Sequence, residues 1–230
     1  MDFLYIILLL SAIILPVLAQ IMVKSSFSKY SKVPCSNSTT GAKTAFLLLR
    51  ANKIGDVKIG AIRGSLTDHY APAKKVIALS EPVCNVNSIA AVGVAAHEAG
   101  HAIQYASGYK LLAGRNVIRK VSSIGSQFGP YVAIAGIAFA FTPLLYAGIA
   151  LFSAAVLFSV LTLPVEFNAS SRALAALRDN RVLTIQELKG VKKVLSACAL
   201  TYVARTLTNF LTLFQLILKA FSRKKRVTKK

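Results

Sequence analysis

Residues 121–165 read VSSIGSQFGPYVAIAGIAFAFTPLLYAGIALFSAAVLFSVLTLPV, which is a run of 45 positions without a charged side chain. As a helix it would be about 67 Å long at about 1.5 Å per residue, enough for two crossings of a hydrocarbon core about 30 Å thick. Thr142-Pro143 interrupts it near the middle, where a helical hairpin needs its turn. The stretch therefore predicts a transmembrane hairpin with spans at about 127–141 and 144–163. A buried hairpin in a soluble domain is the alternative, but a chain of this size cannot easily cover so many apolar residues.

The composition also favours a membrane protein. Hydrophobic residues make up 55% of the 230 residues and charged residues 16%, which excludes a disordered chain, a collagen and a disulfide scaffold. The 28 basic and 8 acidic residues give a net charge of +20, typical of proteins that bind nucleic acid or anionic membranes. Because the basic residues flank the apolar segments, we expect a bilayer with anionic lipids as partner and no nucleic acid.

Residues 3–23 form another uncharged stretch, long enough for one helical crossing. No basic residue precedes it, so an uncleaved anchor is favoured over a cleaved signal peptide. Lys24, Lys29 and Lys32 follow it, and the positive-inside rule then places residues 24–120 in the cytoplasm. Basic residues also flank both ends of the hairpin. We therefore expect an integral multi-pass protein of a bacterial cell membrane.

The apolar stretch 194–218 has two interpretations. Its polar side chains recur every three or four residues on one helix face, with Arg205 among them. The stretch can cross the membrane, or it can lie in the interface, which the basic residues at both of its ends favour slightly. The predicted segments of this mainly α membrane protein are an N-terminal anchor at 1–23, a small α+β domain at 24–120, the hairpin at 121–165, a helical segment at 166–193, a transmembrane or interfacial helix at 194–218 and a basic tail at 219–230.

Cap residues and periodicity divide the rest of the chain into short elements. Asn87 or Ser88 can cap one long helix that Gly108 ends, and Thr184 with Glu187 forms a capping box at the start of another. The three cysteines include no C-x-x-C pair, which indicates reduced thiols. The expected elements are a helix over 39–54, strands over 57–63 and 75–80, a helix over 88–107 and a helix over 166–179.

The helix over 88–107 contains HEAGH, an H-E-x-x-H motif with His97, Glu98 and His101. Histidines four residues apart point to the same side of a helix, so both imidazoles can bind one zinc ion. Glu98 can accept a proton from the water that zinc activates and pass it to the leaving amine of a peptide. Two surface histidines beside an ordinary glutamate are the alternative. The helix is otherwise apolar, however, and a buried His-Glu-His cluster is costly without a metal.

A catalytic zinc site needs a third protein ligand. No histidine follows His101, which leaves three acidic residues as candidates, Glu166, Asp179 and Glu187. The capping box accounts for Glu187, and Asp179 stands at an expected helix end. Glu166 follows the hairpin, whose two crossings would return the chain to the side of the membrane that carries the motif. We therefore predict one Zn²⁺ bound by His97, His101 and Glu166. A carboxylate that merely stabilises a helix N-terminus, after the proline two residues earlier, is the alternative for Glu166.

Four blocks resemble the YugP-type membrane zinc metallopeptidases, and the likeness extends over nearly the whole chain. They are LTDHY at 66–70, HEAGHAIQ at 97–104, LTLPVEFNASSRAL at 161–174 and ELKGVKKVL at 187–195. The resemblance implies a membrane-bound neutral zinc metallopeptidase with a zincin-like cytoplasmic domain. It also implies His97, His101 and Glu166 as zinc ligands and Glu98 as the catalytic acid/base.

The chain is more distantly similar to HtpX-type and CAAX-prenyl proteases, in which an E-x-x-x-D helix follows the hairpin. Here Ser170 stands at the position of that aspartate, which would orient a ligand histidine. We expect Ser170 or Asn168 to do so more weakly. His69 either stabilises the transition state or contacts the substrate, or it is a turn residue. Arg172 either supports the site or binds lipid headgroups. Residues 75–80 are either an edge strand for an extended peptide or, as is favoured, an ordinary strand of a sheet.

The predicted function is a zinc endopeptidase that cleaves membrane or membrane-proximal proteins, or peptides, on the cytoplasmic side. A site-2-type intramembrane protease would take its third ligand from an Asp-Gly pair in a later span, and the chain has no such pair. A catalytically inactive zinc-binding scaffold or assembly factor is the main alternative, although all four expected site residues are present. A nucleic-acid binder fits least, because no aromatic-basic binding motif accompanies the charge.

Overall fold

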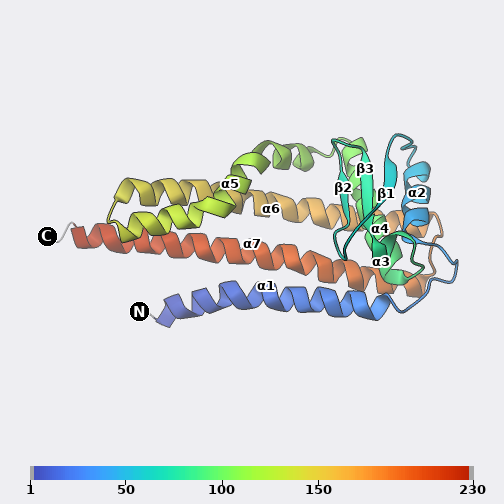
Figure 1. Ribbon diagram of the computed structural model, residues 1–230, viewed down its shortest axis with the longest axis horizontal. Coiled ribbons are helices and arrows are strands. Elements are labelled where there is room, and N and C mark those ends of the chain that lie inside the picture. Colours follow the sequence, from blue (N-terminus) through green and yellow to red (C-terminus); the bar gives the residue numbers. More distant parts are fainter. Residues whose placement is uncertain (1–2, 228–230) are drawn as a thin grey trace. The chain divides into compact units, whose positions relative to one another are not determined.

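The computed structural model describes residues 3–227, mainly as helices with one small sheet (Figure 1). Along the chain the elements are α1 (Phe3–Tyr30), α2 (Gly41–Ala51), β1 (Lys58–Ile62), β2 (His69–Ala71), β3 (Val76–Ser80), α3 (Glu81–Cys84), α4 (Ile89–Ala106), α5 (Lys110–Ala138), α6 (Thr142–Asp179) and α7 (Ile185–Val227). They form two compact units. The motif unit comprises residues 20–112 and 164–200, and the hairpin unit comprises residues 1–19, 113–163 and 201–230.

The motif unit has a three-stranded sheet in the order β1-β3-β2. β3 pairs in parallel with β1 and antiparallel with β2, where His69 lies opposite Ala78. The side chain of Asp68 accepts hydrogen bonds from the backbone N–H (2.7 Å) and the hydroxyl (2.8 Å) of Ser80, which fixes the end of β3 beside the start of β2. The segment LTDHY therefore forms part of the sheet as well as a turn.

The position of β3 in the sheet excludes one of the two interpretations of residues 75–80, that of an edge strand. Because β1 and β3 are parallel and β2 pairs with the other side of β3, this strand is central and both of its edges are occupied. An extended peptide therefore cannot add to β3, and the expectation of an ordinary strand in a sheet is confirmed. The edges of the sheet belong to β1 and β2.

Three helices of the motif unit begin at capping side chains, two of which, at Ser88 and Thr184, the sequence indicates. The Thr40 hydroxyl accepts from the N–H of Lys43, and the Ser88 hydroxyl accepts from the N–H of Ala91. Glu187 accepts from the N–H of Thr184 at 2.7 Å and donates its own N–H to the Thr184 hydroxyl, as a capping box requires. The core between these helices and the sheet contains Leu48, Leu49, Ile77, Leu79, Val92 and Leu177.

Two long helices extend beyond the predicted segments. α6 does not begin at Pro164 but runs through it from Thr142 to Asp179, and α7 continues from the capping box through the whole of 194–218. A proline inside a helix removes one backbone hydrogen bond. The residues that follow Pro164 are held by burial, since Val165, Glu166 and Ala169 are at most 3% exposed. Packing of these residues offsets the lost hydrogen bond, so the helix continues.

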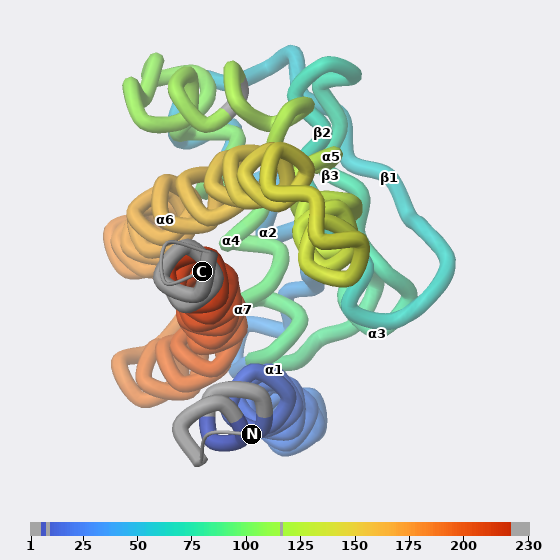
Figure 2. Tube along the Cα trace, turned by 90° about the vertical axis from the view of Figure 1, so that its left-hand side faces the viewer, coloured from blue at the N-terminus to red at the C-terminus, as the bar shows by residue number. Residues whose placement is uncertain are grey.

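In the hairpin unit, α5 and α6 lie side by side and are joined by a tight turn at residues 139–141 (Figure 1, Figure 2). A Cβ on Gly136 would collide with the backbone of Leu145, and one on Gly148 with that of Ala133. Small residues thus bring the two backbones into contact, as is common between membrane helices.

By length and composition, three helical stretches among the described residues could cross a membrane, namely Leu10–Tyr30, Thr142–Asp179 and Ile185–Phe221. α5, which carries the first predicted span of the hairpin, is not among them.

Candidate metal centre

α4 and α6 bring His97, His101 and Glu166 together inside the motif unit. The Nε2 atom of His97 lies 3.3 Å from Oε2 of Glu166, and the Nε2 atom of His101 lies 3.4 Å from the same oxygen. One ligand atom from each residue lies within 4.8 Å of the others. His97 and Glu166 are 69 positions apart in the sequence. The fold thus brings two imidazole nitrogens and a carboxylate close together.

Gly100 allows the two helices to approach closely enough for this. It lies in α4 between the two histidines, and a Cβ at this position would collide with the carbonyl oxygen of Ala169 in α6. Ala169 is completely buried. The glycine of HEAGH therefore has a packing role that the metal-binding motif itself does not require.

The second nitrogen of each imidazole has a hydrogen-bond partner. Nδ1 of His97 lies 3.1 Å from the Ser170 hydroxyl, and Nδ1 of His101 lies 3.0 Å from Oε1 of Gln104. With Nδ1 protonated and bonded in this way, the Nε2 lone pair of each ring is free to face Glu166. Of the two residues proposed to orient a ligand histidine, Ser170 contacts His97 and Asn168 contacts neither histidine in a hydrogen bond found among the described residues.

Gln104 is a site residue that the sequence motifs did not predict. It is completely buried, and its side-chain amide donates to the backbone carbonyl of Val165 at 2.7 Å and to Oδ1 of Asn168 at 3.0 Å. Arg172 donates to the same Asn168 oxygen at 2.8 Å. Asn168 and Arg172 therefore act through Gln104 and do not contact a histidine directly. The sequence signal that could have indicated Gln104 is an amide side chain three residues after His101, on the same face of an apolar helix.

The other two predicted site residues differ in their surroundings. Glu98 is 7% exposed, and burial is unfavourable for a carboxylate. Burial lowers the pKa of the His101 imidazole, but its contact with Glu166 and the charge of Glu98 outweigh this effect, so the pKa lies above its usual range.

His69 is exposed on β2, with Nδ1 2.9 Å from the carbonyl oxygen of Thr67, and is not part of the His-His-Glu cluster.

A family model described as "Putative neutral zinc metallopeptidase" matches residues 5–221. The chain belongs to this family. A relative described as "Putative membrane protease YugP", from Bacillus subtilis (strain 168), is 45% identical over 215 residues, which are 94% of this chain and 96% of the relative. No solved structure matches the chain significantly. The resemblance to the YugP-type metallopeptidases is thereby confirmed.

The donor set of this zinc metallopeptidase family member fits a zinc ion. Two neutral imidazoles and a carboxylate are common ligands of catalytic zinc, which keeps a further position open. Both Nε2 atoms face the carboxylate because both Nδ1 atoms are occupied. His97, His101 and Glu166 could therefore hold one ion.

Proposed function

We propose that this protein is a membrane-bound zinc endopeptidase that hydrolyses peptide bonds of membrane or membrane-proximal proteins on the cytoplasmic side. The observation that carries the proposal is the convergence of two oriented imidazoles and Glu166 at one point, with Glu98 in the same helix. Three helical stretches that could cross a membrane support the membrane location, and the basic flanks support the cytoplasmic side.

His97, His101 and Glu166 would hold the zinc ion, which when bound makes water acidic enough to be deprotonated near neutral pH. The residues around them keep the ligands in the binding form. Ser170 and Gln104 hold the Nδ1 protons of the two histidines, so neither ring has to rotate or change tautomer. This part of the site is organised before a metal or substrate arrives.

Glu98 is the residue that moves protons in the proposed reaction. Its carboxylate accepts a proton from the attacking water, and an oxygen–carbon bond forms at the peptide carbonyl. The carboxylic acid then gives this proton to the peptide nitrogen as the carbon–nitrogen bond breaks. The effect of Glu98 on the pKa of His101 supports its position close to the ligands. The charge that it adds to a buried site also favours binding of a cation.

The test compares Glu98→Gln with the wild-type protein, both purified in detergent with their full chains. Glu98→Gln should retain zinc, measured by metal analysis, and lose cleavage of a membrane-anchored reporter protein by at least about a hundredfold. Glu81→Gln, which makes the same chemical change at an exposed position in α3, is the matched control and should cleave normally.

Two outcomes would decide against the proposal. If Glu98→Gln cleaved as fast as the wild type, Glu98 would not be the acid/base. If the wild-type protein bound zinc and cleaved none of a panel of membrane-protein reporters, the inactive zinc-binding scaffold or assembly factor would be the better interpretation.

A further inference from the structure

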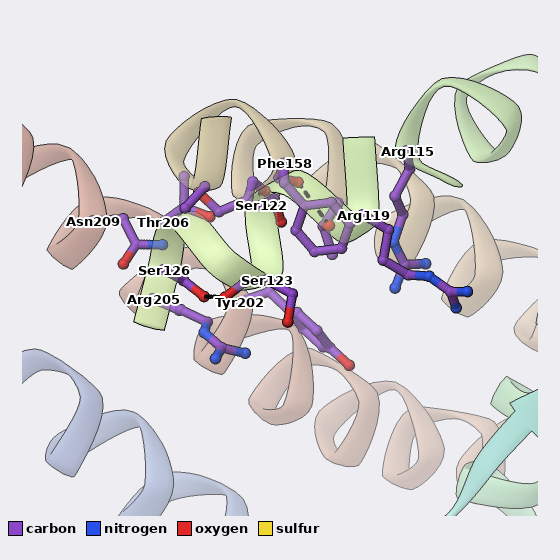
Figure 3. Close-up of a pocket in the computed structure, with 13 residues that line it drawn as sticks. Arg115, Arg119, Ser122, Ser123, Ser126, Phe158, Tyr202, Arg205, Thr206 and Asn209 are labelled. Carbon is purple, nitrogen blue, oxygen red and sulfur yellow. Dashed lines mark hydrogen bonds between the residues drawn. The ribbon is translucent and has the colours of Figure 1, made fainter. Parts of the chain in front are cut away.

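A cavity of about 290 Å³ lies between α5, α6 and α7 in the hairpin unit (Figure 3). Its lining is polar for a helical bundle with so many apolar residues. Three arginines, Arg115, Arg119 and Arg205, line it together with six serine or threonine side chains. All the lining residues belong to the hairpin unit, so the cavity is separate from the candidate metal centre.

The three arginines have no carboxylate among the residues that line the cavity. The sequence of the hairpin unit contains only one acidic residue, Asp2, which lies outside the described residues. None of the ion pairs found within residues 3–227 includes any of the three arginines. The positive charge at this cavity is therefore not neutralised by the described part of the chain.

Arg115 has an unsatisfied donor in addition to its charge. Its Nε atom is buried and has no hydrogen-bond partner among the described residues, while its guanidinium lies over the ring of Phe158, with Cζ 5.5 Å from the ring centroid. A buried donor without a partner is costly. Arg119 is one helical turn further along α5 and shares this face, so the two guanidinium groups serve the same cavity (Figure 3).

Arg205 lies within the apolar stretch Ile185–Phe221, where a charged side chain is unfavourable unless it faces a polar cavity or a partner. The next residue joins α7 to α6 at this level. Thr206 donates a hydrogen bond of 3.3 Å to the carbonyl oxygen of Ser159 in α6, which holds this face of α7 against the cavity. Arg205, which is itself exposed, lines the cavity together with the serines of α5 (Figure 3).

We propose that this cavity binds a phosphate group, carried by the headgroup of an anionic phospholipid. Guanidinium groups bind phosphate oxygens through pairs of hydrogen bonds, and hydroxyl and amide side chains supply further donors. The helices that form the cavity also expose apolar side chains, among them Val121 and Ile124 on α5 and Leu207 and Phe210 on α7. A polar pocket on helices that also expose apolar side chains suits an amphiphile, whose acyl chains would cover apolar surface of these helices. Free phosphate shares the headgroup chemistry and is the other source of the ligand.

The test measures binding of dioleoylphosphatidylglycerol to the full-length protein by native mass spectrometry, with dioleoylphosphatidylcholine as the zwitterionic comparison. Arg205→Gln should weaken phosphatidylglycerol binding about tenfold or more, because it removes charge-assisted hydrogen bonds. Lys120→Gln is the matched control. It removes one positive charge at an exposed position of α5 outside the cavity, and should change binding by less than about twofold. Arg205→Lys, which keeps the charge but loses the paired donors, should fall between them.

A parallel titration with inorganic phosphate, read as a shift in Tm, distinguishes the two sources. Phosphatidylglycerol binding that depends on Arg205 supports the lipid headgroup. An Arg205-dependent phosphate shift without lipid binding supports a free-phosphate site. If Arg205→Gln does not fold, Arg119→Gln, at an exposed position, carries the same test. The proposal is overturned if the cavity variant and Lys120→Gln weaken lipid binding equally and neither affects the phosphate shift.

Discussion

Two side chains that are not metal ligands orient the histidines of the candidate metal centre. The Ser170 hydroxyl contacts Nδ1 of His97, and the Gln104 amide oxygen contacts Nδ1 of His101. A hydroxyl holds an imidazole proton less strongly than a carboxylate does, because it carries no charge. The Gln104 amide is also uncharged, but it is anchored by hydrogen bonds to Val165 and Asn168.

Ser170→Ala removes the partner of His97 without changing a ligand. We expect zinc affinity to fall by about tenfold, since loss of such a hydrogen bond costs about 10- to 100-fold in metal affinity. Competition with a chelator of known affinity measures the change. Ser171→Ala, one residue further along and exposed, should bind zinc as the wild type does. Equal affinities for Ser170→Ala and the wild type would show that the hydrogen bond does not orient the ligand.

The approach of α4 to α6 is the feature of the secondary-structure elements on which the site depends. Gly100 contacts the backbone of Ala169, so the separation of the helices is limited by main-chain atoms and not by side chains that could rotate away. α6 carries Glu166, Ala169 and Ser170 in consecutive turns, which places a ligand, a packing contact and an orienting hydroxyl on one face.

Gly100→Ala should force α4 and α6 apart. We expect a free energy of unfolding lower by about 1–3 kcal/mol, as for overpacked cores, together with loss of zinc affinity. Thermal unfolding and metal analysis of the purified protein measure both effects. Gly114→Ala is the control, because a Cβ at this position of α5 would have no neighbouring atom within 4 Å, and it should be neutral or slightly stabilising. Normal zinc content in Gly100→Ala would contradict the close-approach argument.

For the molecule as a whole, the candidate metal centre connects parts of the chain that the hairpin segment separates in sequence. His97 and His101 precede residues 121–165, and Glu166 follows them directly. An ion bound by all three residues would resist separation of α4 from α6 and stabilise the folded state by mass action.

Removal of zinc should therefore lower Tm. At a free zinc concentration a hundredfold above Kd, the expected stabilisation is about 2.7 kcal/mol. Differential scanning fluorimetry in detergent, with a chelator and with zinc added back, measures the effect. Glu166→Ala should show little response to zinc, and a full response in this variant would exclude Glu166 as a ligand.

The zinc-dependent rise in Tm should also depend on pH. The pKa of His101 in the folded, metal-free protein lies above its usual value, so the folded state binds this proton more tightly than the unfolded state does. The resulting stability is present below the unfolded pKa of about 6.5 and is lost as the pH rises through the folded pKa. Protons compete with zinc for the same nitrogen, so the rise in Tm should be small near about pH 5.5 and larger near about pH 8. A pH-independent rise would contradict this coupling.

Local patterns were sufficient to predict much of the fold and most of the site. The cap at Ser88 and the capping box at Thr184 follow from hydrogen bonds between near neighbours in sequence, and the strands on either side of LTDHY follow from short apolar runs. The i, i+4 spacing of His97 and His101 likewise places both rings on one side of any helix. The continuation of α6 through Pro164 was not predicted, because it depends on packing with a distant segment. The strand β2 was not predicted either, because three residues are too few to show a strand pattern.

The sequence by itself determined the apolar segments, the H-E-x-x-H helix and the choice of Glu166, because charge, periodicity and spacing are properties of the chain that exist before folding. The central place of β3, the role of Gln104 and the contact of Gly100 with Ala169 were decided only by the tertiary structure. The same is true of the arginine-lined cavity, whose residues come from three helices. Each of these depends on distances between residues far apart in the chain, and such distances are set by the packing of whole helices and strands.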